Sequence, residues 1–188
     1  MKFVQQDMEL EVKRAQRGDR EAFIRLFRRL EPELYSLAKS IVGRDEDCAD
    51  AFQETTLKAY KSMSTLRKPK YFKTWVIRIL INECNQLLRM RKRTVVMAEL
   101  PEQANLDRSA PYYKDNRQLD LREAVENLDE SLRIVIHLFY YQDLPIKQIA
   151  SVLDISDGAV RARLHRARGI LADEVKQIRK GELAYENL

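Results

Sequence analysis

The chain has 188 residues, of which 45% are hydrophobic and 34% are charged, so it can form one medium domain or two small ones with apolar cores. Five glycines and five prolines are few, and the abundance of Leu, Arg, Glu, Lys and Ala favours helices over strands. No uninterrupted apolar run is long enough to span a bilayer. The composition therefore predicts an all-α protein and argues against a membrane-spanning one.

Charge is distributed unevenly along the chain, although the formal net charge is only +5. Residues 67–93 contain nine basic residues and one acidic residue, Glu83, whereas residues 45–54 contain five acidic residues and no basic one. These blocks suggest two partners of opposite charge, and the alternative is that both are solvated helix faces.

Two cysteines, Cys48 and Cys84, occur without a CxxC spacing or a nearby histidine. This pattern argues against a disulfide framework and a zinc site, so we expect no metal and no cofactor. Free thiols fit a reducing cytoplasm, and the N-terminal MKFVQQDMELEV lacks the apolar run of a signal peptide. We therefore expect a cytoplasmic protein.

The first half reads as a series of helices that form a domain over residues 1–93. Apolar residues at helical spacing predict helices over residues 9–17, 20–30, 47–63 and 71–93, and another from Pro32 to a stop at Gly43. A loop is expected over residues 64–70, and the stripe Val76, Leu80, Cys84 and Leu87 is the expected buried face of the long helix.

Residues 94–116 have no usable period and contain two prolines, so we predict a flexible linker there. A second helical domain is expected over residues 117–188. Helices are predicted over residues 118–128 and 131–141, and two more lie within residues 144–171, separated by residues 153–156. His137 lies within an apolar run and is expected to pack in the core.

The stretch from Leu144 to Arg168 has the pattern of a helix-turn-helix. Pro145 can begin the first helix because its missing N–H is not needed there, and Ser156 is a good N-cap for the second. Apolar residues then recur at positions that share one side of the second helix: Val160, Leu164, Ala167 and Leu171. The alternative is an ordinary helical hairpin with a solvated basic face.

The other side of that second helix suits the major groove of DNA. Ala162 and His165 lie there with Arg166 beside them, and Arg161 and Arg163 lie on the flanks. A small residue among long basic ones allows close approach while arginine reaches guanine or phosphate.

Several segments resemble the extracytoplasmic-function (ECF) sigma factors of bacterial RNA polymerase, in the sigma-70 family. DAFQETTLKAY at residues 50–60 and YFKTWVIRI at residues 71–79 are similar to motifs of the family's second region, and residues 144–168 are similar to its fourth. The opening AQRGDREAF at residues 15–23 is similar to the family's start. Departures include Thr56 or Leu57 in place of a usual phenylalanine, Ala159 and Ala162 in place of Thr and Ser, and Pro145 and Lys147 in place of a polar and an acidic residue.

The resemblance implies a transcription initiation factor that catalyses no reaction and has no small-molecule substrate. Its implied partners are core RNA polymerase, promoter DNA and an anti-sigma factor that is commonly anchored in the membrane. The implied polymerase-binding residues are Asp50, Gln53, Glu54 and Leu57. An acidic and polar face with an apolar edge suits a basic coiled coil, whereas helix capping alone would explain only Asp47 and Asp50.

The resemblance also implies two DNA-binding surfaces. Basic and aromatic residues would hold the single-stranded minus-ten element, with an unstacked base between the loop at residues 64–70 and the helix near Asn82. This group comprises Lys58, Tyr60, Leu66, Arg67, Tyr71, Phe72, Trp75, Arg78 and Asn82, of which Trp75 by itself is more typical of a core residue. The minus-thirty-five element would contact Ser156, Arg161, Ala162, Arg163, His165 and Arg166.

Two other classes of protein are open to consideration on the sequence. A helical nuclease or phosphotransferase would need a phosphate loop, a HExxH motif or a nucleophile with its base, and the sequence has none of these. A repressor or activator would combine the helix-turn-helix with a sensing domain, but that does not predict a basic aromatic loop beside an acidic helix. Binding to core polymerase without DNA or ligand would distinguish these classes from a sigma factor.

Overall fold

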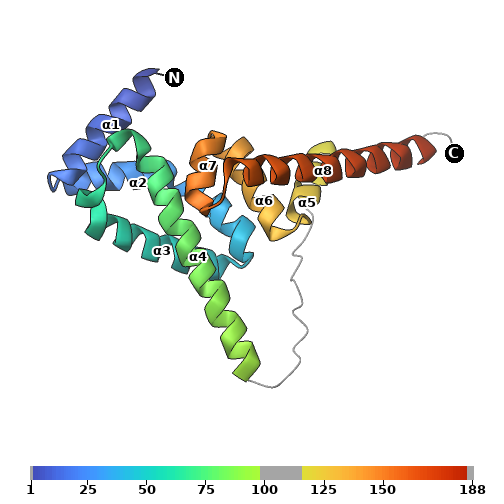
Figure 1. Cartoon of the computed structure of the whole chain (residues 1–188), viewed down its shortest axis with the longest axis horizontal. Helices are drawn as coiled ribbons and strands as arrows, with labels where there is room; N and C mark the ends of the chain where they lie inside the picture. The colour runs from blue at the N-terminus through green and yellow to red at the C-terminus, as the bar shows by residue number, and fades with distance from the viewer. Residues whose placement is uncertain (1, 98–115, 186–188) are drawn as a thin grey trace.

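The structure, a computed structural model, describes residues 2–97 and 116–185, and these form helices and turns without a strand. In chain order the helices are α1 (Lys2–Gln16), α2 (Arg20–Val42), α3 (Asp45–Ser62), α4 (Phe72–Met97), α5 (Asn116–Glu126), α6 (Glu130–Ile136), α7 (Ile146–Leu153) and α8 (Asp157–Tyr185) (Figure 1). The all-α prediction is confirmed.

Helices α1 to α4 pack around one apolar core. Asp19 begins α2 by accepting a hydrogen bond from the Ala22 N–H at 3.0 Å, and Gly43 ends it at a φ of 77°, which glycine adopts without strain. The expected stripe of α4 is buried at Val76, Leu80 and Cys84. The predicted loop between α3 and α4 contains two short 3-10 turns, Met63–Thr65 and Pro69–Tyr71.

The predicted helix boundary at Pro32 is wrong, because α2 continues through that residue. A proline inside a helix removes one backbone hydrogen bond and crowds the preceding turn. Pro32 and Glu31 lie on the exposed side of α2, while Leu30 and Leu34 are buried on the other side. Packing of a continuous apolar stripe against the core therefore outweighs the cost of the proline.

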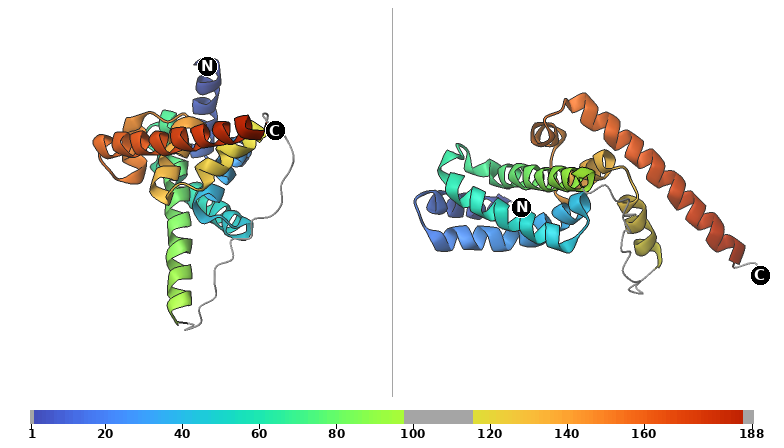
Figure 2. Two further views of the ribbon diagram at one scale, coloured as in Figure 1. Left: turned by 90° about the vertical axis from the view of Figure 1, so that its right-hand side faces the viewer. Right: turned by 90° about the horizontal axis from the view of Figure 1, so that it is seen from below.

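The linker expected over residues 94–116 begins later than predicted, since α4 continues to Met97. The rest of that expectation, residues 98–115, lies outside the described residues. The predicted helix at residues 131–141 is instead α6 followed by a π-helical turn, His137–Tyr141, and α8 extends well beyond the expected end at residue 171. In Figure 2, α8 projects away from the body of the molecule.

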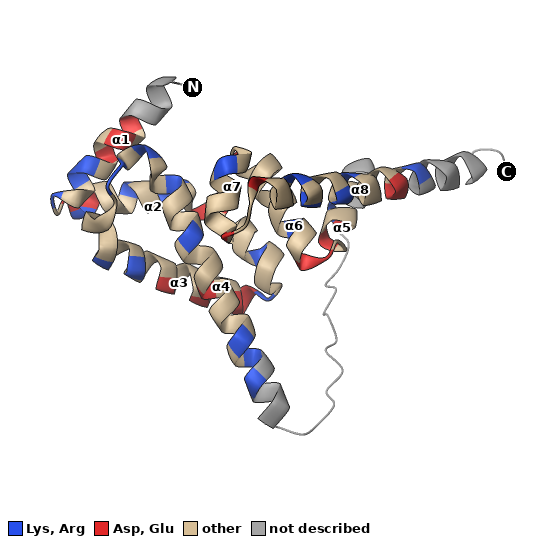
Figure 3. Ribbon diagram, in the orientation of Figure 1, with Lys and Arg blue, Asp and Glu red and all other residues tan. Residues whose placement is uncertain are grey.

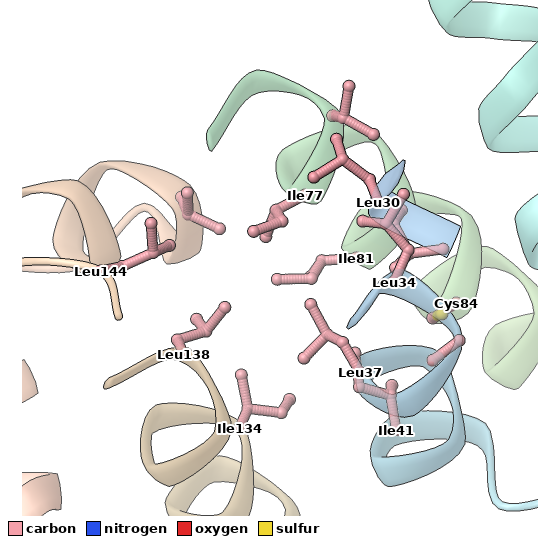
Figure 4. Packing of buried hydrophobic residues seen from close by; sticks show 14 of the residues in the cluster. Leu30, Leu34, Leu37, Ile41, Ile77, Ile81, Cys84, Ile134, Leu138 and Leu144 are labelled. Atoms are coloured by element: carbon pink, nitrogen blue, oxygen red, sulfur yellow. The ribbon is translucent and has the colours of Figure 1, made fainter. Parts of the chain in front are cut away.

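The two halves of the chain pack against each other in a single apolar seam. Ile134, Leu138 and Leu144 from the second half point toward Leu37 and Ile81 and their neighbours on α2 and α4 (Figure 4). Each such side chain contributes roughly 1.5–3 kcal/mol when it is fully buried. Ile77 and Ile81 widen the apolar surface of α4 beyond the predicted stripe, and this second stripe faces the second half.

Polar groups reinforce the seam at its edges. The Arg133 side chain donates to the Ser40 carbonyl at 2.7 Å, and the Gln142 side-chain amide donates to the Glu33 carbonyl at 2.9 Å. Lys73 donates to the Gln142 carbonyl at 3.0 Å and forms an ion pair with Glu33 at 2.6 Å. The seam therefore pairs several polar groups as well as burying apolar ones, although Gln142 Oε1 is buried without a hydrogen-bond partner among the described residues.

None of the helices in residues 2–97 and 116–185 combines the length and apolar character that crossing a bilayer requires.

Candidate nucleic-acid interface

Helices α7 and α8 form a tight helix-turn-helix. α7 ends at Asp154, whose φ of 54° is a left-handed conformation that a short polar residue tolerates, and the Ile155 N–H donates to the Ala150 carbonyl at 3.1 Å. Ser156 then caps α8 by accepting from the Ala159 N–H at 3.1 Å, as the sequence predicts. The connection between the two helices thus fixes the direction in which α8 begins.

The apolar side of α8 is buried and its basic side is open to solvent. Val160, Leu164 and Ala167 are buried, as predicted, and Leu171 is half-buried. On the other side, Arg161, Ala162, His165 and Arg166 are exposed and Arg163 is half-buried. Five of the six predicted minus-thirty-five residues therefore share this accessible side, and the sixth, Ser156, is also exposed.

Arg168 fixes α8 against the preceding helices. Its Nε donates to the Tyr140 hydroxyl at 2.8 Å, and its guanidinium lies over the rings of Phe139 and Tyr140.

His137 is buried and stacks on Tyr141 with ring centroids 4.7 Å apart, which confirms its predicted place in the core. Burial lowers the pKa of His137 to about 4, with the positive charge of Arg133 as a further cause.

The outer face of α3 carries the residues predicted to bind polymerase. All four are exposed: Asp50, Gln53, Glu54 and Leu57. The buried residues lie on the opposite face of the helix: Cys48, Ala51, Thr55 and Ala59.

The two cysteines of the first half are buried thiols. Burial raises the pKa of the Cys48 thiol to about 11 and that of the Cys84 thiol to about 12.

The acids at the start of α3 have structural partners. Asp45 accepts hydrogen bonds from Lys39 and Tyr35, and the Lys39 contact is the main reason that its pKa lies below the usual value. Asp47 pairs with Arg91 at 2.9 Å. Within the described residues, no ion pair or side-chain hydrogen bond holds Asp50 or Glu54, so these two carboxylates are free. Figure 3 shows the acidic positions of α3 in red and the basic positions near its end in blue.

The residues predicted to contact the minus-ten element divide into three groups. Tyr60, Arg67, Tyr71 and Asn82 are exposed. Lys58 and Arg78 are exposed but engaged, because Lys58 pairs with the buried carboxylate of Glu83 at 2.6 Å and Arg78 donates to the Ser151 carbonyl of α7. Leu66, Phe72 and Trp75 lie further inside.

Phe72 requires a correction, since it is fully buried and has no surface to offer a base in this arrangement. Its ring packs edge-on against Phe27 at 6.3 Å and lies behind Trp75 at 6.1 Å, so it supports the site from beneath. Sequence periodicity could have identified this, because Phe72 and Val76 are separated by one helical turn.

A cleft of about 540 Å³ opens beside this cluster. The turn around Leu66 and Arg67 and the half-buried Trp75 form one side of it, and α7 forms the other. Asn82 is exposed on α4 and is not among the residues that line this cleft, so the pocket between the loop and Asn82 stays a prediction. The contribution of α7 to this cleft was not predicted, and its signal in the sequence is the second apolar stripe of α4, at Ile77 and Ile81.

Within the described residues, no group of three or more His, Cys, Asp or Glu side chains is placed to hold a metal ion.

Comparison with known proteins gives two family matches in the order that the helices follow. Residues 26–94 match Sigma-70 region 2, and residues 118–171 match Sigma-70, region 4. The RNA polymerase sigma-H factor of Pseudomonas aeruginosa is 31% identical over 176 residues, which cover 87% of this chain and 91% of that protein. The chain belongs to the ECF sigma factors of the sigma-70 family.

Other ECF and sigma-70 relatives support this assignment. The RNA polymerase sigma factor SigV of Bacillus subtilis is 32% identical over 72% of this chain and 80% of that protein. The ECF RNA polymerase sigma-E factor of Haemophilus influenzae is 29% identical over 89% of this chain and 94% of that protein. The protein is therefore an alternative sigma factor, which acts in transcription initiation.

Solved structures show the same fold. The sigma factor RpoE from Bartonella quintana, in complex with the anti-sigma factor NepR, superposes with a TM-score of 0.69 at 24% identity, covering 82% of this chain and 96% of that one. CnrH, in complex with the cytosolic domain of CnrY, gives a TM-score of 0.65 at 24% identity, covering 90% and 97%.

Proposed function

We propose that this sigma factor docks on core RNA polymerase through the outer face of α3, formed by Asp50, Gln53, Glu54 and Leu57. The observation that carries this proposal is the division of the acids along α3. Asp45 and Asp47 are held by neighbouring side chains, whereas Asp50 and Glu54 are exposed beside the 45%-exposed Leu57. Free carboxylates with an apolar edge complement a basic helical surface on a partner.

We also propose that the exposed side of α8 reads the minus-thirty-five element. Arg161, His165 and Arg166 reach base edges, and Ala162 permits close approach. Arg163 and Ser156 lie nearest the sugar-phosphate backbone of the DNA. This role is supported by the buried stripe on the other side of the helix and by the Ser156 cap, which together leave the basic side of α8 exposed at the start of the helix.

The turn before α4 and the exposed residues of α4 receive the single-stranded minus-ten element. Arg67 supplies positive charge and Tyr71 supplies a ring that is 39% exposed, a combination that suits an unstacked base and its phosphate. The polymerase carries out phosphoryl transfer, and the sigma factor contributes only binding energy that selects and holds the promoter.

The docking surface is tested by replacing Gln53 and Glu54 with lysine in the full chain. We expect the double variant Gln53→Lys/Glu54→Lys to keep its helix content, because both side chains are exposed, and to lose co-elution with core polymerase. Glu31→Lys, an exposed charge reversal on α2, is the control and should co-elute normally. Co-elution of the double variant at wild-type affinity would place the docking surface elsewhere.

We further propose that an anti-sigma factor restrains this protein in the cytoplasm and releases it under stress. Support comes from RpoE and CnrH, which were solved with NepR and with the cytosolic domain of CnrY. A membrane-anchored inhibitor that covers the α3 face would prevent polymerase docking. Hydrogen exchange of α3 amides in such a complex should be slower than in the free chain, and equal exchange would contradict occlusion.

A further inference from the structure

The cleft between the two halves has the size of a small-molecule site. Its volume of about 540 Å³ falls within the range of roughly 300–1,000 Å³ that is usual for such sites. One wall comes from residues 65–68, from Tyr71 and from α4 between Thr74 and Arg78, and the other comes from α7 between Lys147 and Val152. Because the walls lie in different halves of the chain, the cleft exists only while the halves are packed together.

Positively charged side chains line this cleft. They are Arg67, Lys68, Arg78 and Lys147, and none of the described residues that line the cleft is acidic. Arg78 donates to the Ser151 carbonyl, whereas Arg67, Lys68 and Lys147 have no ion-pair partner among the residues that the structure describes. Three free cations from two directions favour an anion between them.

The apolar part of the cleft lining comes from Leu66, Val152 and Trp75. Leu66 and Val152 are buried, and Trp75 is half-buried and packs against Phe72 with ring centroids 6.1 Å apart, so the indole is held in place. An aromatic ring among cationic side chains can stack on a planar group while the cations bind an attached anion.

We propose that this cleft binds a mononucleotide-sized ligand. Its planar ring lies against Trp75, and its phosphate lies between Lys147 on α7 and the side chains of Arg67 and Lys68. Since the ligand contacts both walls, its binding stabilises the packed arrangement of the two halves relative to any separated one.

One consequence rests on the proposed function. If Trp75 and Arg78 also bind minus-ten DNA, the ligand competes with the promoter for them. Lys147 belongs to the ligand site alone, because it is not among the residues assigned to polymerase or DNA. A Lys147 variant therefore tests ligand binding without changing the residues that are proposed to bind polymerase or promoter DNA.

The test uses the fluorescence of the full chain, because Trp75 is the only tryptophan. Guanosine monophosphate is the probe, and guanosine and inorganic phosphate are the single-feature comparisons. We expect saturable quenching by guanosine monophosphate with an affinity at least about tenfold higher than that of either comparison. Quenching that rises linearly, as it does for a free tryptophan derivative, would overturn the proposal.

Two variants locate the site. Lys147→Glu should weaken guanosine monophosphate binding about tenfold or more while leaving core polymerase binding unchanged. Lys176→Glu changes the charge by the same amount at an exposed position on α8 that does not line the cleft, and it should leave the affinity unchanged. Wild-type affinity in Lys147→Glu would show that α7 is not part of the site and would overturn the proposal, whatever the outcome of the polymerase experiment.

Discussion

Glu83 places a carboxylate at the interface of α3 and α4, where its side chain is only 9% exposed and its partner is Lys58 at 2.6 Å. A buried carboxylate that loses its partner keeps its desolvation cost without the compensating contact. Lys58 was predicted to contact DNA, so a Lys58 variant would change stability as well as any DNA affinity.

Lys58→Met should therefore lower the free energy of unfolding by about 1–3 kcal/mol. The double variant Lys58→Met/Glu83→Gln should recover much of this loss, since an uncharged amide is cheaper to bury. Urea denaturation measures both, with Lys61→Met, an exposed lysine on the same helix, as the control that should change little. Equal stability of Lys58→Met and the wild type would mean that the ion pair contributes nothing.

His137 makes the stability of the fold depend on pH. Its pKa is about 4 in the folded chain and 6.5 when unperturbed, so folding favours the neutral ring. The contribution of the neutral His137 ring to the free energy of unfolding is fully present above pH 6.5. It is lost as the pH falls through 6.5 toward 4, because the unfolded chain then binds a proton that the folded chain does not. Between pH 7 and pH 5 the unfolding free energy should fall by about 2 kcal/mol from this group.

His137→Phe keeps an apolar ring beside Tyr141 but removes the titration. Urea denaturation at the two pH values should show a smaller fall for this variant than for the wild type. An identical fall in both proteins would assign the acid sensitivity to other groups.

Arg166 is the side chain through which base reading by α8 is tested. Arg166→Ala should cost about 1–3 kcal/mol of affinity for minus-thirty-five DNA if the guanidinium contacts a base. Lys176→Ala removes one positive charge from the same helix, beyond the helix-turn-helix, and should cost much less. Equal losses in a fluorescence anisotropy titration would indicate general electrostatic attraction in place of base reading.

Individual side chains were predictable where one helix decides their position. The exposed side of α8 and the cap at Ser156 follow from periodicity and capping within that helix. The partners of Lys58 and Arg78 were not predictable, because they lie 25 and 73 residues away and depend on how helices pack.

At the scale of whole elements, Pro32 shows that tertiary packing can override a local stop signal. α2 retains the proline at an exposed position although an interior proline costs on the order of 3 kcal/mol relative to alanine. Sequence rules predicted a break because they treat the helix in isolation.

Pro32→Ala should accordingly stabilise the protein by about 1–3 kcal/mol, because it restores a backbone donor and relieves crowding within α2. Ser36→Ala, an exposed change on the same helix, serves as the control and should add only a few tenths of a kcal/mol. A lower midpoint of urea denaturation for Pro32→Ala would mean that the proline stabilises α2, for example by fixing a bend.

For the whole molecule, the sequence predicted the order of the helices and most of their positions, apart from the false break at Pro32, but not the seam between the halves. Gln142 and Glu33, for example, are 109 residues apart and meet through one hydrogen bond. Nothing in the local pattern of either residue specifies that contact, whereas the excess apolar width of α4 at Ile77 and Ile81 indicates that some second surface must cover it.

The central claim, that this chain directs core RNA polymerase to promoters, is tested most directly by run-off transcription on genomic DNA fragments. With core polymerase and the wild-type chain, we expect transcripts whose start sites lie at a constant distance from a shared pair of upstream elements, and we expect Gln53→Lys/Glu54→Lys to abolish them. Transcripts identical to those of core polymerase alone, or start sites without shared upstream elements, would contradict the claim.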